Sequence, residues 1–180
     1  VRDQYAAYNR AMLEALPNIQ PYVQYYKRFN KSYHVLFQIE SVAQKGKSLP
    51  RVAALVEAMF MVELKNQLLT AGHDFDKLVQ PLKLGIGTGE ESYTLMNGQT
   101  QTLKAQDMYM ADDAGIISSI IYGPDRRTAI NADTRRVLFV VYAPPGIGAE
   151  KVKSHLEDIR DTVLIVSPSA ATVLLECYQA

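Results

Sequence analysis

The pattern of apolar residues changes once along the chain, near Gly72, and this change limits the folds that the chain can adopt. Before Gly72, apolar side chains recur at helical spacing, and after it they fall in short runs separated by Gly, Asn and Asp. Helical spacing buries one face of a helix, whereas short runs rich in β-branched and aromatic residues suit strands. Helices followed by strands predict an α+β fold.

The part before Gly72 predicts four helices separated by turn-forming residues. Pro17-Asn18 separates the first two, and Lys45-Gly46-Lys47 ends the third with cations and a glycine. The fourth has the clearest apolar stripe and should end near residues 70–72. The predicted segments are 5–16, 19–29, 33–44 and a helix after Ser48-Leu49-Pro50 whose stripe is Val52, Leu55, Val56, Met59 and Phe60.

The part after Gly72 predicts a mostly antiparallel sheet and one late helix. Asn97-Gly98 is the sharpest hairpin signal, because both residues tolerate the positive φ of a tight turn. The late helix spans 149–160. The predicted strands are 82–86, 92–96, 107–111, 115–121, 137–142, 162–166 and 172–175. We expect one α+β domain over residues 1–180, with N-terminal helices packed on a mostly antiparallel, β-sandwich-like sheet.

Composition excludes several classes of protein. The 180 residues are 48% apolar, which suits one ordinary core. The chain has 19 basic residues (Lys and Arg) and 19 acidic residues (Asp and Glu). The overall charge therefore does not favour binding of a long nucleic-acid duplex, and any contact with nucleic acid must be local. The single cysteine, Cys177, excludes an internal disulfide and a cysteine zinc site. We see no signal peptide or membrane anchor and expect a cytoplasmic protein; the sequence does not give the oligomeric state.

A glycine-rich segment, Leu84 to Glu91, resembles a phosphate-binding loop at first sight. It lacks the Lys-Ser/Thr of a P-loop and precedes a strand pattern, so we interpret it as a turn. HExxH, CxxC and GxSxG are absent, and the three histidines are scattered. No metal or other cofactor is therefore expected.

Two residues are candidates for catalysis. His73 lies where helical spacing ends, beside the carboxylates of Asp74 and Asp76. A neighbouring carboxylate can orient an imidazole and hold its pKa near neutrality, although a structural histidine is the simpler interpretation. Glu57 shares a helical face with apolar residues, which marks a possible buried acid; a solvated glutamate is the alternative.

Four arginines on two successive loops are candidates for phosphate contacts. Arg126 and Arg127 follow Tyr122-Gly123, and Arg135 and Arg136 come shortly after. The planar guanidinium suits phosphate, and the alternative is a solvated loop with acid partners such as Asp125.

Eight short motifs follow one another along most of the chain. They are Leu49-Pro50-Arg51, Val56-Glu57, His73 to Leu78, Gly89-Glu90, Leu95 to Gly98, Ala111 to Gly115, Tyr122-Gly123 and Thr134 to Phe139. Their order resembles that of the B3/B4 module of the phenylalanyl-tRNA synthetase beta subunit. The resemblance is closer still to free-standing proteins made of that module alone, and it covers residues from about 20 to about 160.

The resemblance implies an α+β domain whose pocket receives the aminoacylated 3′ end of tRNA and hydrolyses a wrongly attached tyrosine. His73 falls at the family's editing-site histidine, and Asp125 falls where the synthetase has a glutamate that binds the tyrosine hydroxyl. This chain departs from the family at Phe60, which replaces a pocket asparagine, and near Val141 or Tyr142, where the family has a small residue. Both changes narrow or dry the pocket.

Three functions remain open at this point. The first is a stand-alone hydrolase of misacylated tRNA, in which His73 activates water and Asp125 or Glu57 reads the aminoacyl group. The second is a non-catalytic module that binds RNA ends or an amino-acid-like ligand, and the third is a small-molecule enzyme on a re-used fold. For the first two we expect tRNA as a partner and no membrane contact. The predicted pocket is lined by His73, Glu57, Tyr122, Gly123, Asp125, Phe60 and Tyr142.

Overall fold

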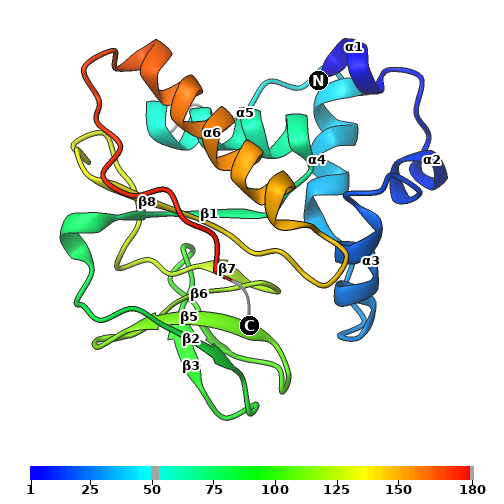
Figure 1. Ribbon diagram of the computed structural model, residues 1–180. Coiled ribbons are helices and arrows are strands. Elements are labelled where there is room, and N and C mark those ends of the chain that lie inside the picture. Colours follow the sequence, from blue (N-terminus) through cyan, green and yellow to red (C-terminus); the bar gives the residue numbers. More distant parts are fainter. Residues whose placement is uncertain (50–52, 179–180) are drawn as a thin grey trace. The chain divides into compact units, whose positions relative to one another are not determined.

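A computed structural model describes residues 1–49 and 53–178 (Figure 1). Pro50, Arg51 and Val52 lie outside the described residues; they include part of one motif and the first position of the predicted stripe. The chain divides into two compact units. The first, here called the helical unit, is Val1–Thr70 with Val141–Ala180, and the second, the sheet unit, is Ala71–Val140. The expectation of a single domain stays a prediction.

Helices make up most of the regular structure of the helical unit. They are α1 (Arg2–Tyr5), α2 (Arg10–Glu14), α3 (Gln20–Lys27), α4 (His34–Ala43), α5 (Ala54–Asn66) and α6 (Ala149–Val166). The single helix predicted over 5–16 is wrong, because residues 6–9 separate α1 from α2. The other three helices predicted before Gly72 and the late helix predicted over 149–160 are confirmed near their expected places.

Two strands predicted near the end of the chain are wrong. Residues 162–166 continue α6, and 172–175 form no regular element. A short apolar run fits a strand or a buried helix turn equally well. The helix continues because no breaker occurs before Pro168, and it ends at Val166 because the residue before a proline disfavours the helical conformation.

Buried tyrosines form much of the core of the helical unit. Tyr22 and Tyr33 stack with ring centroids 4.5 Å apart and nearly parallel planes. The Tyr22 hydroxyl donates to the Tyr142 carbonyl at 2.7 Å and accepts from the Leu69 amide at 3.1 Å. The hydroxyl group of a buried tyrosine needs hydrogen-bond partners. Tyr22 finds them on the backbone of Leu69, which follows α5, and of Tyr142.

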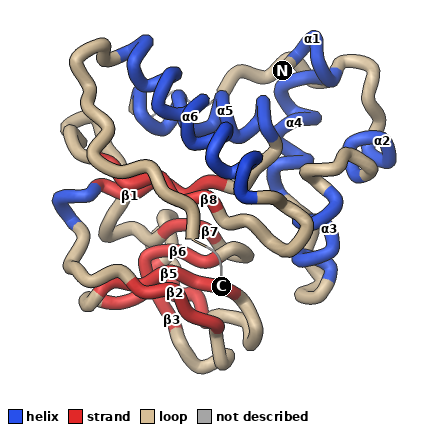
Figure 2. Tube along the Cα trace, in the orientation of Figure 1, coloured by secondary structure: helices blue, strands red, loops and turns tan. Residues whose placement is uncertain are grey.

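The strands form three separate sheets within the described residues (Figure 2). The largest has the order β2-β5-β6-β7 and is antiparallel throughout; β3 pairs antiparallel with β4, and β1 pairs with β8. The α+β class is confirmed. The strands are β1 (Thr70–Asp74), β2 (Lys83–Ile86), β3 (Ser92–Thr94), β4 (Thr100–Thr102), β5 (Met108–Asp112), β6 (Gly115–Ser119), β7 (Gly123–Pro124) and β8 (Val137–Val141).

Strand β1 lies where the sequence predicted the end of a helix. Gln67 adopts a left-handed conformation, φ 64°, which ends α5 before the predicted position. Every residue of β1 is buried, so the strand shows no alternation of apolar and polar residues by which it could be recognised. The hairpin at Asn97-Gly98 is confirmed, with Gly98 at φ +84° between β3 and β4.

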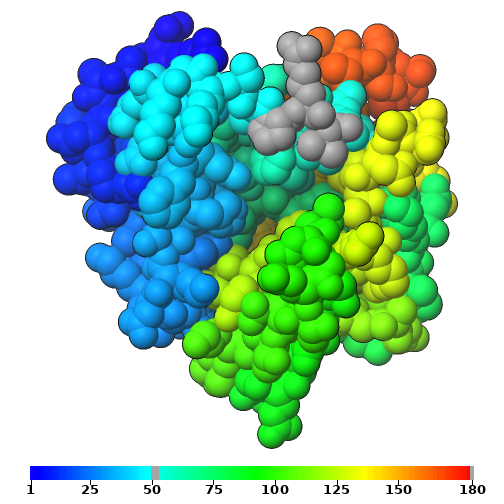
Figure 3. Space-filling model, turned by 180° about the vertical axis from the view of Figure 1, so that it is seen from behind, coloured from blue at the N-terminus to red at the C-terminus, as the bar shows by residue number. Residues whose placement is uncertain are grey.

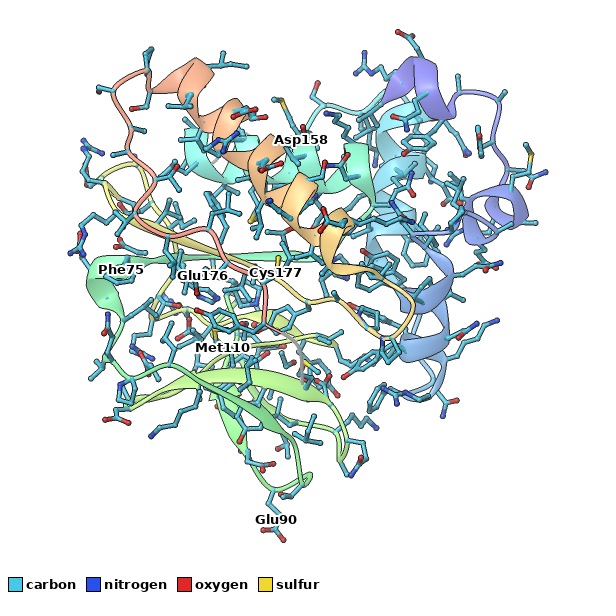
Figure 4. The ribbon with its side chains drawn as sticks, in the orientation of Figure 1. Phe75, Glu90, Met110, Asp158, Glu176 and Cys177 are labelled. Atoms are coloured by element: carbon cyan, nitrogen blue, oxygen red, sulfur yellow. The ribbon has the colours of Figure 1, made fainter. Side chains whose placement is uncertain are left out.

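The glycine-rich segment Leu84 to Glu91 leads from β2 into a loop. The Glu91 carboxylate accepts hydrogen bonds from the amides of Thr88, at 2.9 Å, and Gly89, at 3.2 Å. Glu90 points away from the ribbon in Figure 4, and green atoms of this region form the tip of the sheet unit in Figure 3. Amides that a phosphate would need are thus bonded to a carboxylate of the same loop.

Candidate functional site

The site is built where β1 meets the loop that connects β7 to β8. The Asp74 amide donates to the Thr128 carbonyl at 2.8 Å, and the Phe75 amide donates to the Arg136 carbonyl at 2.9 Å. These backbone bonds hold both ends of the loop beside the last residues of β1. The strand thereby fixes the position of His73 relative to the loop side chains.

His73 and Asp125 are joined through one hydroxyl group. Nδ1 of His73 lies 2.7 Å from Oγ1 of Thr128, and that hydroxyl also bonds to Oδ1 of Asp125. The Thr128 amide donates to the same carboxylate oxygen at 3.1 Å. All three residues are buried, and His73 and Thr128 have no exposed surface.

The hydroxyl bonds determine where the proton of the His73 ring lies. Thr128 has one hydroxyl proton, and the carboxylate of Asp125 accepts it, so Oγ1 is the acceptor for an Nδ1–H donor. Nε2 then carries the lone pair, and it is buried without a hydrogen-bond partner among the described residues. Burial, assisted by the nearby charge of Arg127, lowers the pKa of His73 to about 4. The ring is therefore neutral at pH 7.

Arg127 links two buried carboxylates beside this histidine. Its guanidinium lies 2.7 Å from Oδ1 of Asp112 and 3.7 Å from Oδ2 of Asp125, and it donates to the Lys77 carbonyl at 3.0 Å. Asp112 also accepts from the amides of Val79 and Ala114. Although burial opposes it, these hydrogen bonds hold the pKa of Asp112 below its usual value. Arg127 is thus an internal ion-pair partner as well as a loop cation.

The other three predicted RNA-binding arginines differ in what holds them. Arg136 forms an ion pair with Asp76 at 2.7 Å and lies over the Phe75 ring, labelled in Figure 4, at 4.6 Å from its centroid. Among the residues that the structure describes, the Arg135 guanidinium donates only to carbonyls of its own loop. The Arg126 side chain is exposed and has no acid partner within the described residues. Of the four arginines, Arg126 and Arg135 are therefore the most available to an anion.

Tyr122 and Gly123 lie on the connection from β6 to Asp125. The Tyr122 amide donates to the Ser119 hydroxyl at 3.1 Å, and the Gly123 carbonyl accepts from the Tyr93 hydroxyl at 2.7 Å. Gly123 has φ +79°, a conformation that favours glycine. The sheet unit therefore brings Tyr122, Gly123 and Asp125 together on one short segment, and joins that segment to His73.

The remaining predicted site residues belong to the helical unit. Glu57 and Phe60 are half-buried on α5, and Tyr142 is buried after β8. The buried acid of α5 is Glu63 instead: it is 1% exposed, and one of its oxygens accepts from the Thr70 amide at 2.8 Å. Burial raises the pKa of Glu63 to about 8.

Sequence reasoning missed Thr128 as a member of the site. A signal was present, since Asp125 and Thr128 are three residues apart, the spacing at which a side chain caps a nearby amide. Within residues 1–49 and 53–178, no group of three or more His, Cys, Asp or Glu side chains is arranged to hold a metal ion. No helix in the same residues is long and apolar enough to cross a membrane.

Comparison with known proteins agrees with the resemblance seen in the sequence. The model of the B3/4 domain family matches residues 22–158. A solved structure that matches is an N-terminal fragment of the phenylalanyl-tRNA synthetase beta-subunit from Pyrococcus horikoshii, with a TM-score of 0.54 and 16% identity. The match covers 61% of this chain but only 38% of that one. A search of curated proteins found no match. The family match spans most of the chain and includes every predicted site residue, and the chain therefore belongs to the B3/4 domain family.

Proposed function

We propose that this chain binds the aminoacylated 3′ end of a tRNA and hydrolyses the ester of a misattached amino acid, with His73 as the general base. The observation that carries the proposal is the His73 ring: Nδ1 is fixed by Thr128, and Nε2 has a free lone pair. Membership of the B3/4 family supports a role connected with tRNA.

The proposed reaction needs one base and a polarised ester. Nε2 of His73 accepts a proton from water while the water oxygen attacks the ester carbonyl carbon. The tetrahedral intermediate then collapses, the bond to the ribose oxygen breaks, and Nε2 returns the proton to that oxygen. A base oriented through its other ring nitrogen suits this cycle, because the hydrogen bond at Nδ1 fixes both tautomer and direction.

We assign Asp125 to orienting His73 and not to reading the amino acid. One of its oxygens is bonded to the amide and hydroxyl of Thr128, and the other faces Arg127. Tyr122 and Gly123 precede it on the same segment, and we propose that they border the substrate. For Glu57, Phe60 and Tyr142 the support is the resemblance alone.

We propose that Arg126 and Arg135, with Arg136 beside them, contact tRNA phosphates. Arginine binds phosphate best when its guanidinium is not already engaged by a carboxylate, which favours the first two. The net charge of the chain is zero, so the contact is local and should weaken with salt.

A non-catalytic binding module is the second candidate function, and one observation favours it. Nε2 of His73 is buried in the structure, so water must gain access to it before any hydrolysis. The two candidates agree on the ligand and differ on whether the ester is cleaved.

A deacylation assay on a panel of mischarged tRNAs separates the two. His73→Asn is the informative variant, because the asparagine amide can still donate to Thr128 while Nε2 is lost. General-base catalysis predicts a loss of about 100-fold or more in rate with little change in tRNA binding. A wild-type chain that binds aminoacyl-tRNA without cleaving any member of the panel overturns the catalytic proposal and leaves the binding module.

A further inference from the structure

The helical unit contains a pocket that takes no part in the proposed hydrolysis. Its volume is about 500 Å³, and its lining residues come from the connection between α2 and α3, the end of α5 and the first turns of α6. These elements can be followed in Figure 1. The pocket is open to solvent, and its volume is large enough for a small molecule. Its lining combines apolar side chains, such as Pro17 and Leu68, with polar and charged side chains.

Two amide side chains at the end of α5 offer unused acceptors to this pocket. The Asn66 amide nitrogen donates to Asp158 at 2.7 Å and lies 3.3 Å from Nδ1 of His155, while its oxygen has no partner among the described residues. The Gln67 amide nitrogen donates to the Tyr5 hydroxyl, and the Gln67 side-chain oxygen likewise has no hydrogen-bond partner in the part of the chain that the structure describes. Both acceptors lie on residues that line the pocket.

The buried histidine of the lining brings no charge to the pocket. His155 is 1% exposed, and burial lowers its pKa to about 4. Nδ1 accepts from Asn66, so the ring proton lies on Nε2, which is 2.8 Å from the Thr70 hydroxyl. Behind the lining, Asp158 forms an ion pair with Lys65 at 3.0 Å. The charges that a ligand meets are therefore those of the rim.

The rim carries one charge of each sign on consecutive residues of α6. Glu150 is exposed, with no ion pair or hydrogen bond among the described residues. Lys151 is exposed, and its ammonium donates one bond, at 2.6 Å, to the side chain of Asn18, which leaves further protons to donate. Ser154, one turn along the helix, adds a hydroxyl that has no hydrogen-bond partner within residues 1–49 and 53–178.

We propose that this pocket binds a free α-amino acid with an apolar side chain, as the zwitterion. Glu150 and the amide oxygens of Asn66 and Gln67 suit the ammonium group, because they are acceptors only. Lys151 and Ser154 donate to the carboxylate, and Pro17 and Leu68 contact the side chain. Neither a simple amine nor a simple carboxylate would use both signs of charge.

Calorimetric titration of the full chain with three matched probes tests this proposal. Leucine carries both charges, 3-methylbutylamine lacks the carboxylate, and 4-methylpentanoate lacks the ammonium. We expect leucine to bind at least 10-fold more tightly than either partial probe. Glu150→Gln and Lys151→Met should each weaken leucine binding about 10-fold, as expected for the loss of one charged contact.

Two matched variants control for the charge of α6. Glu157→Gln and Lys153→Met remove charges from the same helix but not from the pocket lining, so they should leave leucine binding unchanged. The proposal is overturned if the amine binds as tightly as leucine, if the control variants weaken binding as much, or if leucine does not bind at 20 mM. Titration of His73→Asn separates this pocket from the proposed hydrolytic site, because leucine binding should be unaffected there.

Discussion

The Nδ1 atom of His73 lies 2.7 Å from the Thr128 hydroxyl, and this one contact decides which nitrogen of the ring is available for chemistry. With Nδ1 engaged, the lone pair of Nε2 is the only basic position left on the ring. The carboxylate of Asp125 acts on the imidazole indirectly, because it accepts the proton of the Thr128 hydroxyl. Three side chains from β1 and one loop thus define a base with a fixed direction.

Replacing Thr128 by valine should lower the deacylation rate about 10- to 100-fold, because Nδ1 loses the acceptor that fixes the tautomer. Thr128→Ser keeps the hydroxyl and should restore most of the rate. Thr134 is a matched control, since its hydroxyl is buried in the same loop and bonds to Asp74 at 2.8 Å. Thr134→Val should cost stability but spare the rate of the folded protein. Equal rate losses in both valine variants would argue against a specific role for Thr128.

Replacing Glu63 by glutamine should remove a loss of stability that the wild-type chain suffers as pH rises. The pKa of Glu63 is raised to about 8 by burial, so between about pH 4.5 and 8 only the unfolded chain releases this proton. Stability therefore falls across that window by an amount on the order of 5 kcal/mol, and it levels off above it. Glutamine does not titrate and still accepts from the Thr70 amide.

Urea unfolding at pH 5 and pH 8 measures this effect. Glu63→Gln should gain stability relative to wild type between the two values. Glu57→Gln, a half-buried position on the same helix, serves as the control and should follow wild type. A wild-type chain whose pH dependence matches that of Glu63→Gln would show that Glu63 is ionised in the folded state.

Acid should destabilise the fold through its histidines. Burial lowers the pKa of His34, His73 and His155 to about 4, below the ordinary value of about 6.5. Between these values the unfolded chain binds protons that the folded chain does not, so their contribution is full above pH 6.5 and is lost as pH falls toward 4. Each contributes on the order of 1 to 3 kcal/mol. Unfolding measured in the Glu63→Gln background isolates this effect; histidine NMR titration with ring pKa values near 6.5 would contradict it.

The arginines should separate into a stabilising member and RNA-facing members. Arg127→Met removes the ion-pair partner of Asp112, whose side chain is fully buried, and should cost about 1 to 3 kcal/mol of stability. Arg126→Met with Arg135→Met should leave stability nearly unchanged. That double variant should weaken tRNA binding and lower the slope of log affinity against log salt by about 1 to 2. Unchanged binding in the double variant would place the RNA contact elsewhere.

The sequence predicted the change from helices to strands, because helical spacing and strand texture are local patterns. It did not predict β1, since a strand buried throughout has no alternation and the left-handed turn at Gln67 has no glycine to mark it. The sequence pattern predicted Glu57 as the buried acid of its helix, whereas the structure buries Glu63. This error also arose because local patterns do not show contacts with distant residues. Apolar spacing shows that a helix has a buried face, but a carboxyl within that face depends on a partner elsewhere, here the Thr70 amide.

The pairing of His73 with Asp125 could be anticipated only from the resemblance, because the two residues lie far apart in the chain. What the resemblance did not supply is the intervening hydroxyl. Thr128 has the same local spacing to Asp125 as many capping residues, and its second contact, to His73, depends on how the loop is bonded to β1.

The hydroxyl of Tyr22 has a consequence for how the pairing of β1 with β8 begins. Leu69 immediately precedes β1 and Tyr142 immediately follows β8, and the Tyr142 amide bonds to the Leu69 carbonyl at 3.1 Å. The Tyr22 hydroxyl joins the two unused groups of that pair, accepting from the Leu69 amide and donating to the Tyr142 carbonyl. One phenol oxygen on α3 therefore replaces the direct hydrogen bond between the Leu69 amide and the Tyr142 carbonyl, and a residue early in the chain helps to hold together two strands formed far later in it.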